Sequence, residues 1–240
     1  MIFRKIRELF FPNRCVSCGE ILDENENLCE YCAEMLERCP SDKMCPKCGC
    51  NKKECDCSKR VYSFNGICAP FYNTGIAKEV VYAFKFHQRE GFAEFLSREM
   101  VLALKQQFSD TDFDFVTFVP MYKRAKSKRG YNQSELLAEN VGKILKLPVY
   151  GNILKSKKKK RRQFITPLNE RFDNVKGIYY TDLRLNGETV LLIDDIKTTG
   201  ATLQECAKAL LIAGADNVYC LTCLTTRKKK GNSDGNRYRN

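Results

Sequence analysis

One stretch of the sequence predicts a strand, a loop and a helix in direct succession. Residues 190–193 form an unbroken apolar run, which is typical of a parallel strand covered on both faces. The run ends at the adjacent carboxylates Asp194 and Asp195, and a Thr-rich loop follows. Beyond the loop, apolar and small residues recur with the period of a helix until Gly214, where a helix is expected to end. We therefore expect the strand to lie at the centre of a sheet.

The acidic pair and the loop together predict a site for a phosphorylated ribose. Adjacent carboxylates repel each other unless cations or hydroxyl donors share them, as a divalent metal ion and a ribose diol would. The loop supplies hydroxyl groups, a glycine that can adopt a positive φ angle, and the N–H groups of a helix start, which form a cradle for an anion. The candidate ligand-binding residues are Asp194, Asp195, Lys197, Thr198, Thr199, Gly200, Ala201 and Thr202.

Two other interpretations of this stretch arise. A nucleotide-binding P-loop is excluded because the sequence lacks Gly-x-x-x-x-Gly-Lys-Ser/Thr and places carboxylates where that motif would begin. A purely structural role remains open, in which the carboxylates begin a turn and the Thr hydroxyls cap the helix. The stretch resembles the phosphoribosylpyrophosphate (PRPP) signature of type I phosphoribosyltransferases. That resemblance implies that the acidic pair holds the ribose hydroxyls, that the Thr loop binds the 5′-phosphate, and that Mg²⁺ accompanies PRPP.

The cysteines divide the chain unevenly. Ten of the 14 lie between Cys15 and Cys57. The sequence therefore predicts a Cys-rich domain over residues 1–59 and a second domain over residues 60–240. The 240 residues are enough for one large or two smaller domains.

The spacing of the cysteines favours structural zinc. Two Cys-x-x-Cys knuckles begin at Cys15 and Cys29, and a second set ends in a Cys-x-Cys pair. Each set can supply four thiolates to one tetrahedral ion, so we expect one or two Zn²⁺ ions. Disulfides and an iron–sulfur cluster are the alternatives, and Cys39 or Cys50 could substitute in the second set. The candidate ligands are Cys15, Cys18, Cys29, Cys32, Cys45, Cys48, Cys55 and Cys57.

The sequence predicts a cytoplasmic protein. No apolar run approaches the length of a membrane span, and the N-terminus lacks the pattern of a signal peptide. Residues 1–11 alternate apolar and basic side chains, which fits either a docking helix or peripheral contact with acidic lipid at the inner face of the membrane.

The net charge of +12 is concentrated in three basic clusters, within residues 123–129, 155–162 and 227–230. Such clusters indicate an anionic partner, and phosphate ligands, nucleic acid and acidic lipid all qualify, as do solvated loops without a partner. The candidates for binding pyrophosphate are Lys123, Arg124 and Arg129. The candidates for binding nucleic acid are Lys157, Lys158, Lys159, Lys160, Arg161 and Arg162.

Strand and helix patterns alternate through the second domain. We expect strands at residues 113–121, 187–195 and 217–225, and helices over 77–107, with an interruption near 88–91, and over 132–145. This order predicts an α/β fold with a parallel sheet, in which ligands bind beyond the C-terminal ends of the strands.

Four blocks in one order resemble the ComF family. They are the double Cys-x-x-Cys head, residues 118–137 with Arg-Gly-Tyr-Asn-Gln-Ser, the segment from Gln163 to Gly177, and the PRPP-like loop. The family combines a zinc-ribbon head with a type I phosphoribosyltransferase-like domain, and its ComFC members are linked to DNA uptake in natural transformation. The resemblance implies single-stranded DNA and a helicase as partners. The chain departs from the family at Lys160, where relatives usually carry Thr, and at the Cys-x-Cys pair.

Two functions remain open from the sequence. One is a protein that binds PRPP or a related ribose phosphate during the uptake of single-stranded DNA. The other is an active phosphoribosyltransferase acting on an unidentified base or amine. Transfer requires a stabilised ribose cation and a positioned acceptor, and no acceptor pocket is readable from the sequence.

Overall fold

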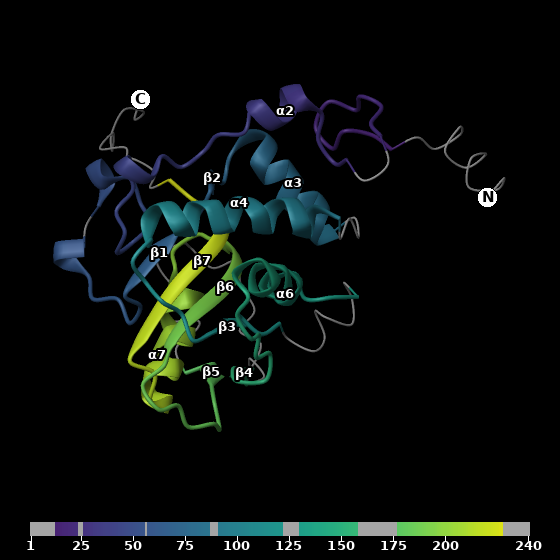
Figure 1. The fold of residues 1–240 in the computed structure, drawn as a ribbon. Coiled ribbons are helices and arrows are strands. Elements are labelled where there is room, and N and C mark those ends of the chain that lie inside the picture. The colour runs from purple at the N-terminus through teal and green to yellow at the C-terminus, as the bar shows by residue number, and fades with distance from the viewer. Residues whose placement is uncertain are drawn as a thin grey trace, which may run out of the picture.

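The computed structural model describes residues 13–23, 26–55, 57–86, 91–121, 130–157 and 177–227. In this part of the chain five strands form one parallel sheet (Figure 1). The strands are β1 (Gly66–Cys68), β2 (Phe71–Tyr72), β3 (Phe115–Phe118), β6 (Thr189–Lys197) and β7 (Asn217–Thr225). The order across the sheet is β1, β7, β6 and β3, and β2 pairs with β7 further along the edge that β1 occupies.

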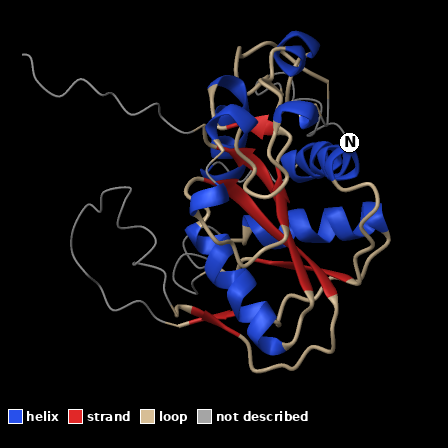
Figure 2. Cartoon of the chain, turned by 90° about the vertical axis from the view of Figure 1, so that its left-hand side faces the viewer, coloured by secondary structure: helices blue, strands red, loops and turns tan. Residues whose placement is uncertain are grey.

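Helices cover both faces of the sheet (Figure 1, Figure 2). One face carries α3 (Gly75–Phe86), α4 (Phe92–Gln107) and α6 (Gln133–Leu145), and the other carries α7 (Ala201–Ala213). A separate antiparallel pair, β4 (Lys155–Ser156) and β5 (Tyr179–Tyr180), lies beside α7. The Cys-rich part contains α2 (Glu30–Glu34) and the 3₁₀ helices η1 (Ser41–Lys43), η2 (Lys52–Glu54) and η3 (Cys57–Lys59).

Strand β6 is the centre of the core. Its side chains alternate, so that Val190 and Leu192 pack with the residues of α7, while Leu191 and Ile193 pack with those of α3, α4 and α6. All four are fully buried, as an unbroken apolar run with parallel neighbours on both sides requires. Because this strand is held on both faces and both edges, the polar residues at its end have fixed positions.

The ends of two helices follow from local chemistry. Helix α6 begins after Asn132, whose side chain accepts a hydrogen bond from the Ser134 N–H at 3.1 Å. Helix α7 ends at Gly214, whose φ of 110° is in the left-handed region, and a Cβ there would lie 2.3 Å from the Leu185 carbonyl oxygen. Glycine is therefore required at this position both by its backbone angle and by the close approach of residue 185.

The predicted fold class is confirmed: the sheet is parallel, helices flank it, and two cysteine groups lie in the N-terminal part. The strand expected over residues 217–225 has those bounds, and the helix expected over 132–145 begins one residue later. The strand expected over 113–121 is shorter, and the one expected over 187–195 runs to Lys197. Strands β1, β2, β4 and β5 were not predicted, because two or three residues are too few to show a period.

The Cys-rich part packs closely on the sheet. The Cys39 N–H donates to the Pro70 carbonyl at 2.7 Å, and the Ile67 N–H donates to the Pro46 carbonyl at 2.8 Å. Met44 is buried and its sulfur accepts from the Tyr72 hydroxyl at 3.3 Å. The domain boundary near Lys59 stays a prediction, but residues 39–46 contact the strands that begin the second predicted domain.

Candidate functional site

The acidic pair at the end of β6 already has a cation and a hydroxyl as partners. The Lys85 ammonium lies 2.6 Å from Asp195 Oδ2, and the Ser134 hydroxyl donates to Asp194 Oδ1 at 3.0 Å. Asp194 Oδ1 also accepts from the Asp195 N–H at 2.9 Å. The sequence predicted that the pair would require cations or hydroxyls, and within the protein Lys85 and Ser134 supply one of each.

Burial and charge act in opposite directions on Asp194. Desolvation and the neighbouring Asp195 carboxylate raise the pKa of Asp194 to about 7, against the lowering effects of Lys85 and of the hydrogen bond from Ser134. A carboxyl group with this pKa is partly protonated at neutral pH. A ligand that brings hydroxyl donors or a divalent cation to the pair would favour the charged form.

Lys85 and Ser134 come from two helix ends that meet at the site. Lys85 lies in the last turn of α3, and Ser134 lies in the first turn of α6. The Tyr131 hydroxyl donates a short hydrogen bond to the Phe84 carbonyl, and the Gln133 amide donates to the Lys85 carbonyl at 3.4 Å. The segment from residue 131 to 134 therefore joins α6 to the end of α3.

Neither Lys85 nor Ser134 was among the predicted site residues. The sequence contained one signal for Ser134, since it belongs to the Arg-Gly-Tyr-Asn-Gln-Ser block that marked the family resemblance. Lys85 lies in an amphipathic helix without a local motif. Only the packing of α3 against the sheet brings its ammonium to Asp195, which is 110 positions later in the sequence.

The Thr-rich loop follows β6 directly and leads into α7. Gly200 has a φ of 81°, the left-handed conformation that the sequence predicted for this glycine. It precedes α7 without a side-chain cap, and the Ala201 N–H donates a long hydrogen bond of 3.3 Å to Thr199 Oγ1. Thr198 is exposed, whereas Ala201 is buried. The loop thus presents an exposed hydroxyl and an uncapped helix start beside the acidic pair, which is the geometry of an anion cradle.

The side chain of Lys197 passes close to this loop, since a Cβ added at Gly200 would lie 3.9 Å from Lys197 Cε. It is buried, and its ammonium lies 3.2 Å from the Cys50 sulfur and 3.5 Å from the Thr225 hydroxyl. Only the backbone of Lys197 could therefore contribute to the predicted ligand site, since its amine contacts the Cys-rich part.

Most of the basic candidates fall outside the described residues. These are Lys123, Arg124, Arg129, Lys158, Lys159, Lys160, Arg161 and Arg162. Lys157 is described, and its ammonium lies 5.2 Å from the centroid of the Tyr180 ring, within range of a cation–π contact. It belongs to the end of the β4–β5 pair.

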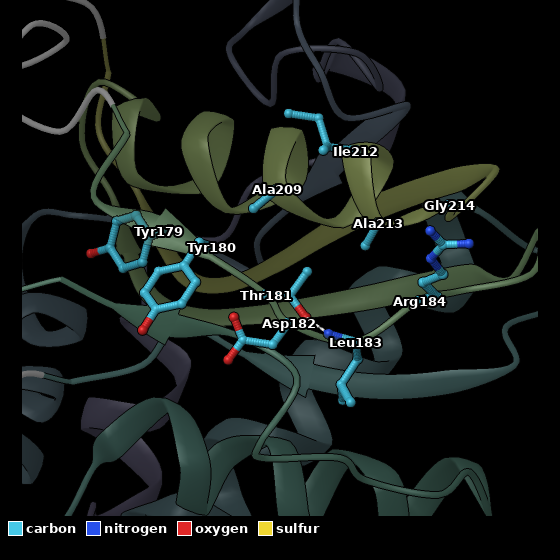
Figure 3. A pocket seen from close by; sticks show the side chains of 10 residues that line it. All are labelled: Tyr179, Tyr180, Thr181, Asp182, Leu183, Arg184, Ala209, Ile212, Ala213 and Gly214. Atoms are coloured by element: carbon cyan, nitrogen blue, oxygen red, sulfur yellow. Dashed lines mark hydrogen bonds between the residues drawn. The ribbon is translucent and has the colours of Figure 1, made fainter.

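A groove of about 560 Å³ lies between the C-terminal half of α7 and residues 179–184 (Figure 3). Tyr180 and Arg184 line it, together with Ile212, which is 77% exposed. The groove ends at Gly214, opposite the start of α7 at Ala201. A 13-residue helix is about 20 Å long, so the groove and the Thr-rich loop are separate.

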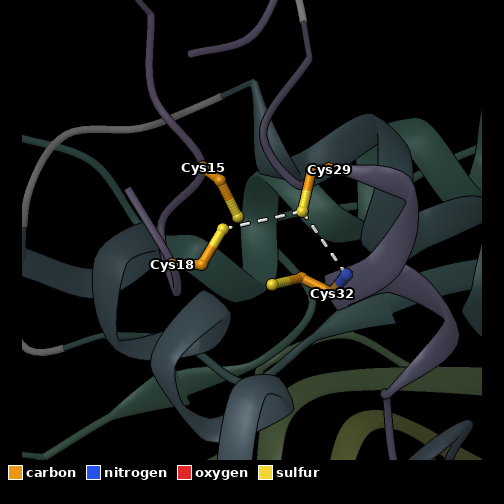
Figure 4. Close-up of side chains that lie close together, drawn as sticks. All are labelled: Cys15, Cys18, Cys29 and Cys32. Atoms are coloured by element: carbon orange, nitrogen blue, oxygen red, sulfur yellow. Dashed lines mark hydrogen bonds between the residues drawn. The ribbon is translucent and has the colours of Figure 1, made fainter. Parts of the chain in front are cut away.

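The first cysteine group has the geometry of a zinc site. The sulfurs of Cys15, Cys18, Cys29 and Cys32 lie within 4.8 Å of one another and converge on one point (Figure 4). The Cys18 and Cys29 sulfurs are 3.6 Å apart, close to the value of about 3.8 Å expected for thiolates 2.3 Å from one tetrahedral Zn²⁺. Burial opposes the ionisation of Cys15, but backbone hydrogen bonds at Cys18 and Cys29 lower the pKa of Cys15 to about 6.

The second group is formed by the four cysteines that the sequence predicted. The sulfurs of Cys45, Cys48, Cys55 and Cys57 lie within 4.8 Å of one another, so the Cys-x-Cys pair does not prevent their convergence. The Cys45 sulfur is 3.4 Å from that of Cys55 and 3.8 Å from that of Cys57. All 14 cysteines are free thiols in the structure, so both groups could hold zinc and the disulfide alternative receives no support.

No family model matches the chain. Competence protein F of Haemophilus influenzae is 26% identical over 221 residues, which cover 87% of this chain and 95% of the relative. Competence protein ComFC of Bacillus subtilis is 29% identical over 81% of this chain and 82% of its own length. DNA utilization protein YhgH of Escherichia coli K12 is 29% identical over 59% of this chain and 65% of its own length. The chain belongs to the ComF family.

The match to competence protein F extends over nearly the whole of that relative's own length. Among solved structures, a purine phosphoribosyltransferase from Pyrococcus horikoshii is 17% identical and covers 56% of this chain and 85% of that chain, with a TM-score of 0.35. Glutamine PRPP amidotransferase from B. subtilis is 22% identical over 55% of this chain and 25% of that chain, with a TM-score of 0.34. TM-scores this low do not support an inference about function.

Among the described residues, no helix combines the length and the apolar character that crossing a membrane would require.

Proposed function

We propose that the chain binds PRPP or a related ribose 5-phosphate at the C-terminal end of β6. The observation that carries the proposal is the direct succession of a partly buried acidic pair and an uncapped helix start with a left-handed glycine. Asp194 and Asp195 accept hydrogen bonds from the ribose hydroxyls, and residues 198–202 bind the 5′-phosphate through hydroxyl and N–H groups.

Ligand binding exchanges partners at the acidic pair. The ribose hydroxyls and a Mg²⁺ ion bound to pyrophosphate take over part of the charge compensation that Lys85 and Ser134 supply to Asp195 and Asp194. The released Lys85 ammonium is then free to pair with a ligand phosphate. Lys123, Arg124 and Arg129 are our candidates for neutralising the rest of the pyrophosphate.

We further propose that this binding serves the handling of single-stranded DNA in the cytoplasm during its uptake, alongside a helicase. The relatives named competence proteins and DNA utilization protein support this proposal. Lys157 beside Tyr180 also supports it, because basic residues interleaved with aromatic rings suit single strands. Residues 158–162 extend this basic character along the sequence. Catalytic transfer of the phosphoribosyl group to a base or amine is the alternative function.

The test is a calorimetric titration of the full chain with PRPP, with and without Mg²⁺. We expect Mg²⁺-dependent binding that is lost when Asp194→Asn and Asp195→Asn are combined, because the pair then no longer carries the charge that the ligand requires. Asp182→Asn is the matched control, since this exposed carboxylate lies at the groove and not at the loop. Unchanged binding in the double variant would overturn the proposal. Release of pyrophosphate in the presence of a base, amine or DNA would favour the catalytic alternative.

A further inference from the structure

Lys197 is a buried cation without a carboxylate partner among the residues that the structure describes. It is 5% exposed, and its ammonium has two neighbours, the Cys50 sulfur at 3.2 Å and the Thr225 hydroxyl at 3.5 Å. A buried ammonium is costly unless a negative charge compensates it. Cys50 connects this ammonium to the Cys-rich part, which carries the candidate zinc ligands.

A zinc-filled second cysteine group would supply a compensating charge. The Cys50 carbonyl accepts a hydrogen bond from the N–H of Cys45, one of the four convergent ligands, at 2.8 Å. Four thiolates around one Zn²⁺ leave two negative charges uncompensated in a partly buried site. Lys197 approaches this group through Cys50, whose sulfur lies 3.2 Å from its ammonium, so it is placed to balance the charge of a bound zinc ion without being a ligand.

The same lysine ends the strand that leads into the phosphate loop. Lys197 is the last residue of β6, and Thr198 follows it directly. Its carbonyl accepts from the Thr226 N–H at 3.0 Å, while the neighbouring Thr225 hydroxyl donates to the Gly49 carbonyl at 3.1 Å. The residue before the loop is thus tied to the cysteine knuckle directly, by the Lys197 side chain at Cys50, and indirectly, through the end of β7, where the Thr225 hydroxyl reaches Gly49.

We propose that Lys197 is a positioning residue that couples the second zinc site to the phosphate loop. A filled second site holds the Lys197 ammonium and with it the start of the loop, so zinc raises the affinity for a phosphate monoester. By thermodynamic linkage, a bound phosphate monoester strengthens zinc retention at the second site by the same factor. The first cysteine group makes no such contact with β6 among the described residues and serves as the internal comparison. The part of this inference that concerns phosphate binding rests on the proposed function.

The first arm of the test needs no phosphate ligand. Zinc release to a chelator is measured for the full chain and for Lys197→Met and Lys197→Arg. The Cys18→Ser and Cys57→Ser backgrounds remove a ligand from the first and the second site, so each release phase can be assigned. We expect Lys197→Met to release the second-site zinc about tenfold faster, because the counter-charge is lost, and Lys197→Arg to restore slow release. Parent-like release from the second site in Lys197→Met would overturn the charge-balancing role.

The second arm measures linkage with ribose 5-phosphate as the probe. We expect the probe to slow zinc release from the second site about fivefold and to leave the first site unchanged. Cys57→Ser should weaken the affinity for ribose 5-phosphate by the same factor, whereas Cys18→Ser should leave it at the parent value. Binding without any change in second-site release would overturn the coupling and leave the proposed function intact. Absence of probe binding in the parent would overturn both, and the first arm would still decide the role of Lys197.

Discussion

The Lys85 ammonium lies 2.6 Å from Asp195 Oδ2, and this ion pair joins the last turn of α3 to the end of the central strand. Both side chains are less than one-fifth exposed. The contact explains how two adjacent carboxylates are accommodated before any ligand arrives. A ligand that displaced Lys85 would have to neutralise the Asp195 carboxylate in its place.

Lys85→Met should destabilise the fold by about 1–3 kcal/mol, because it leaves a partly buried carboxylate without its cation. Urea unfolding at neutral pH measures the effect. Adding Asp195→Asn to Lys85→Met should recover much of the loss, as a double-mutant cycle on a true ion pair requires. Strictly additive losses in the two single variants would contradict the pairing.

Asp194→Asn should stabilise the ligand-free protein, and more strongly as the pH rises. The pKa of Asp194 in the fold is about 7, above the ordinary value of 3.8, so the folded state binds this proton more tightly than the unfolded state. The contribution of Asp194 to the free energy of unfolding therefore falls as the pH rises from 4 to 7. The Asp194→Asn variant lacks this group and does not lose stability in this way. We expect the difference between the variant and the parent to grow by about 2–3 kcal/mol between pH 5 and pH 8. Equal differences at the two pH values would show that Asp194 titrates normally, and exposed Asp182→Asn provides the comparison.

The purified chain should contain about two zinc ions, since each cysteine group matches tetrahedral thiolate spacing. Elemental analysis measures the content, and Cys18→Ser and Cys57→Ser should each lower it to about one ion. Cys206→Ser is the control, because this thiol is buried on α7 and belongs to neither group. A metal-free protein, or cysteines found as disulfides, would exclude this assignment.

Binding of single-stranded DNA should depend on salt through the second basic cluster. Contact with about four to six phosphates predicts a log–log slope near −3 to −4. Changing residues 157–160 from Lys to Gln should flatten the slope and weaken binding, while the affinity for PRPP stays near that of the parent. The control changes four exposed helical lysines to Gln, namely Lys78, Lys105, Lys143 and Lys208. An equal slope in both variants would mean that the second basic cluster does not contact DNA and is either solvated or bound to pyrophosphate.

Gly214→Ala should destabilise the protein by about 2–4 kcal/mol, because it combines a left-handed φ with a Cβ 2.3 Å from the Leu185 carbonyl oxygen. Thermal or urea unfolding measures the loss. Gly75→Ala separates the two causes, since Gly75 has a φ of 46° and a Cβ added there would meet no atom within 4 Å. Similar losses at both positions would leave backbone strain as the sole cause.

Local patterns were sufficient for much of this molecule. The apolar run at residues 190–193, the positive φ at Gly200 and the end of α7 at Gly214 all follow from short-range sequence rules. The spacing of the cysteines likewise selected both groups of four, because knuckle geometry depends on residues only a few positions apart.

The contacts that complete the site depend on tertiary packing. Lys85 reaches Asp195 because α3 lies on the sheet, and Ser134 reaches Asp194 because Asn132 starts α6 beside the end of β3. The sequence also suggested a ligand role for Lys197, but the packing of the cysteine knuckle on β6 and β7 directs its ammonium to Cys50. Residue type and spacing thus determined the strand, the loop and the thiolate groups by themselves. Which charges meet was decided only by the fold, because such pairs join residues more than 50 positions apart whose proximity no local preference encodes.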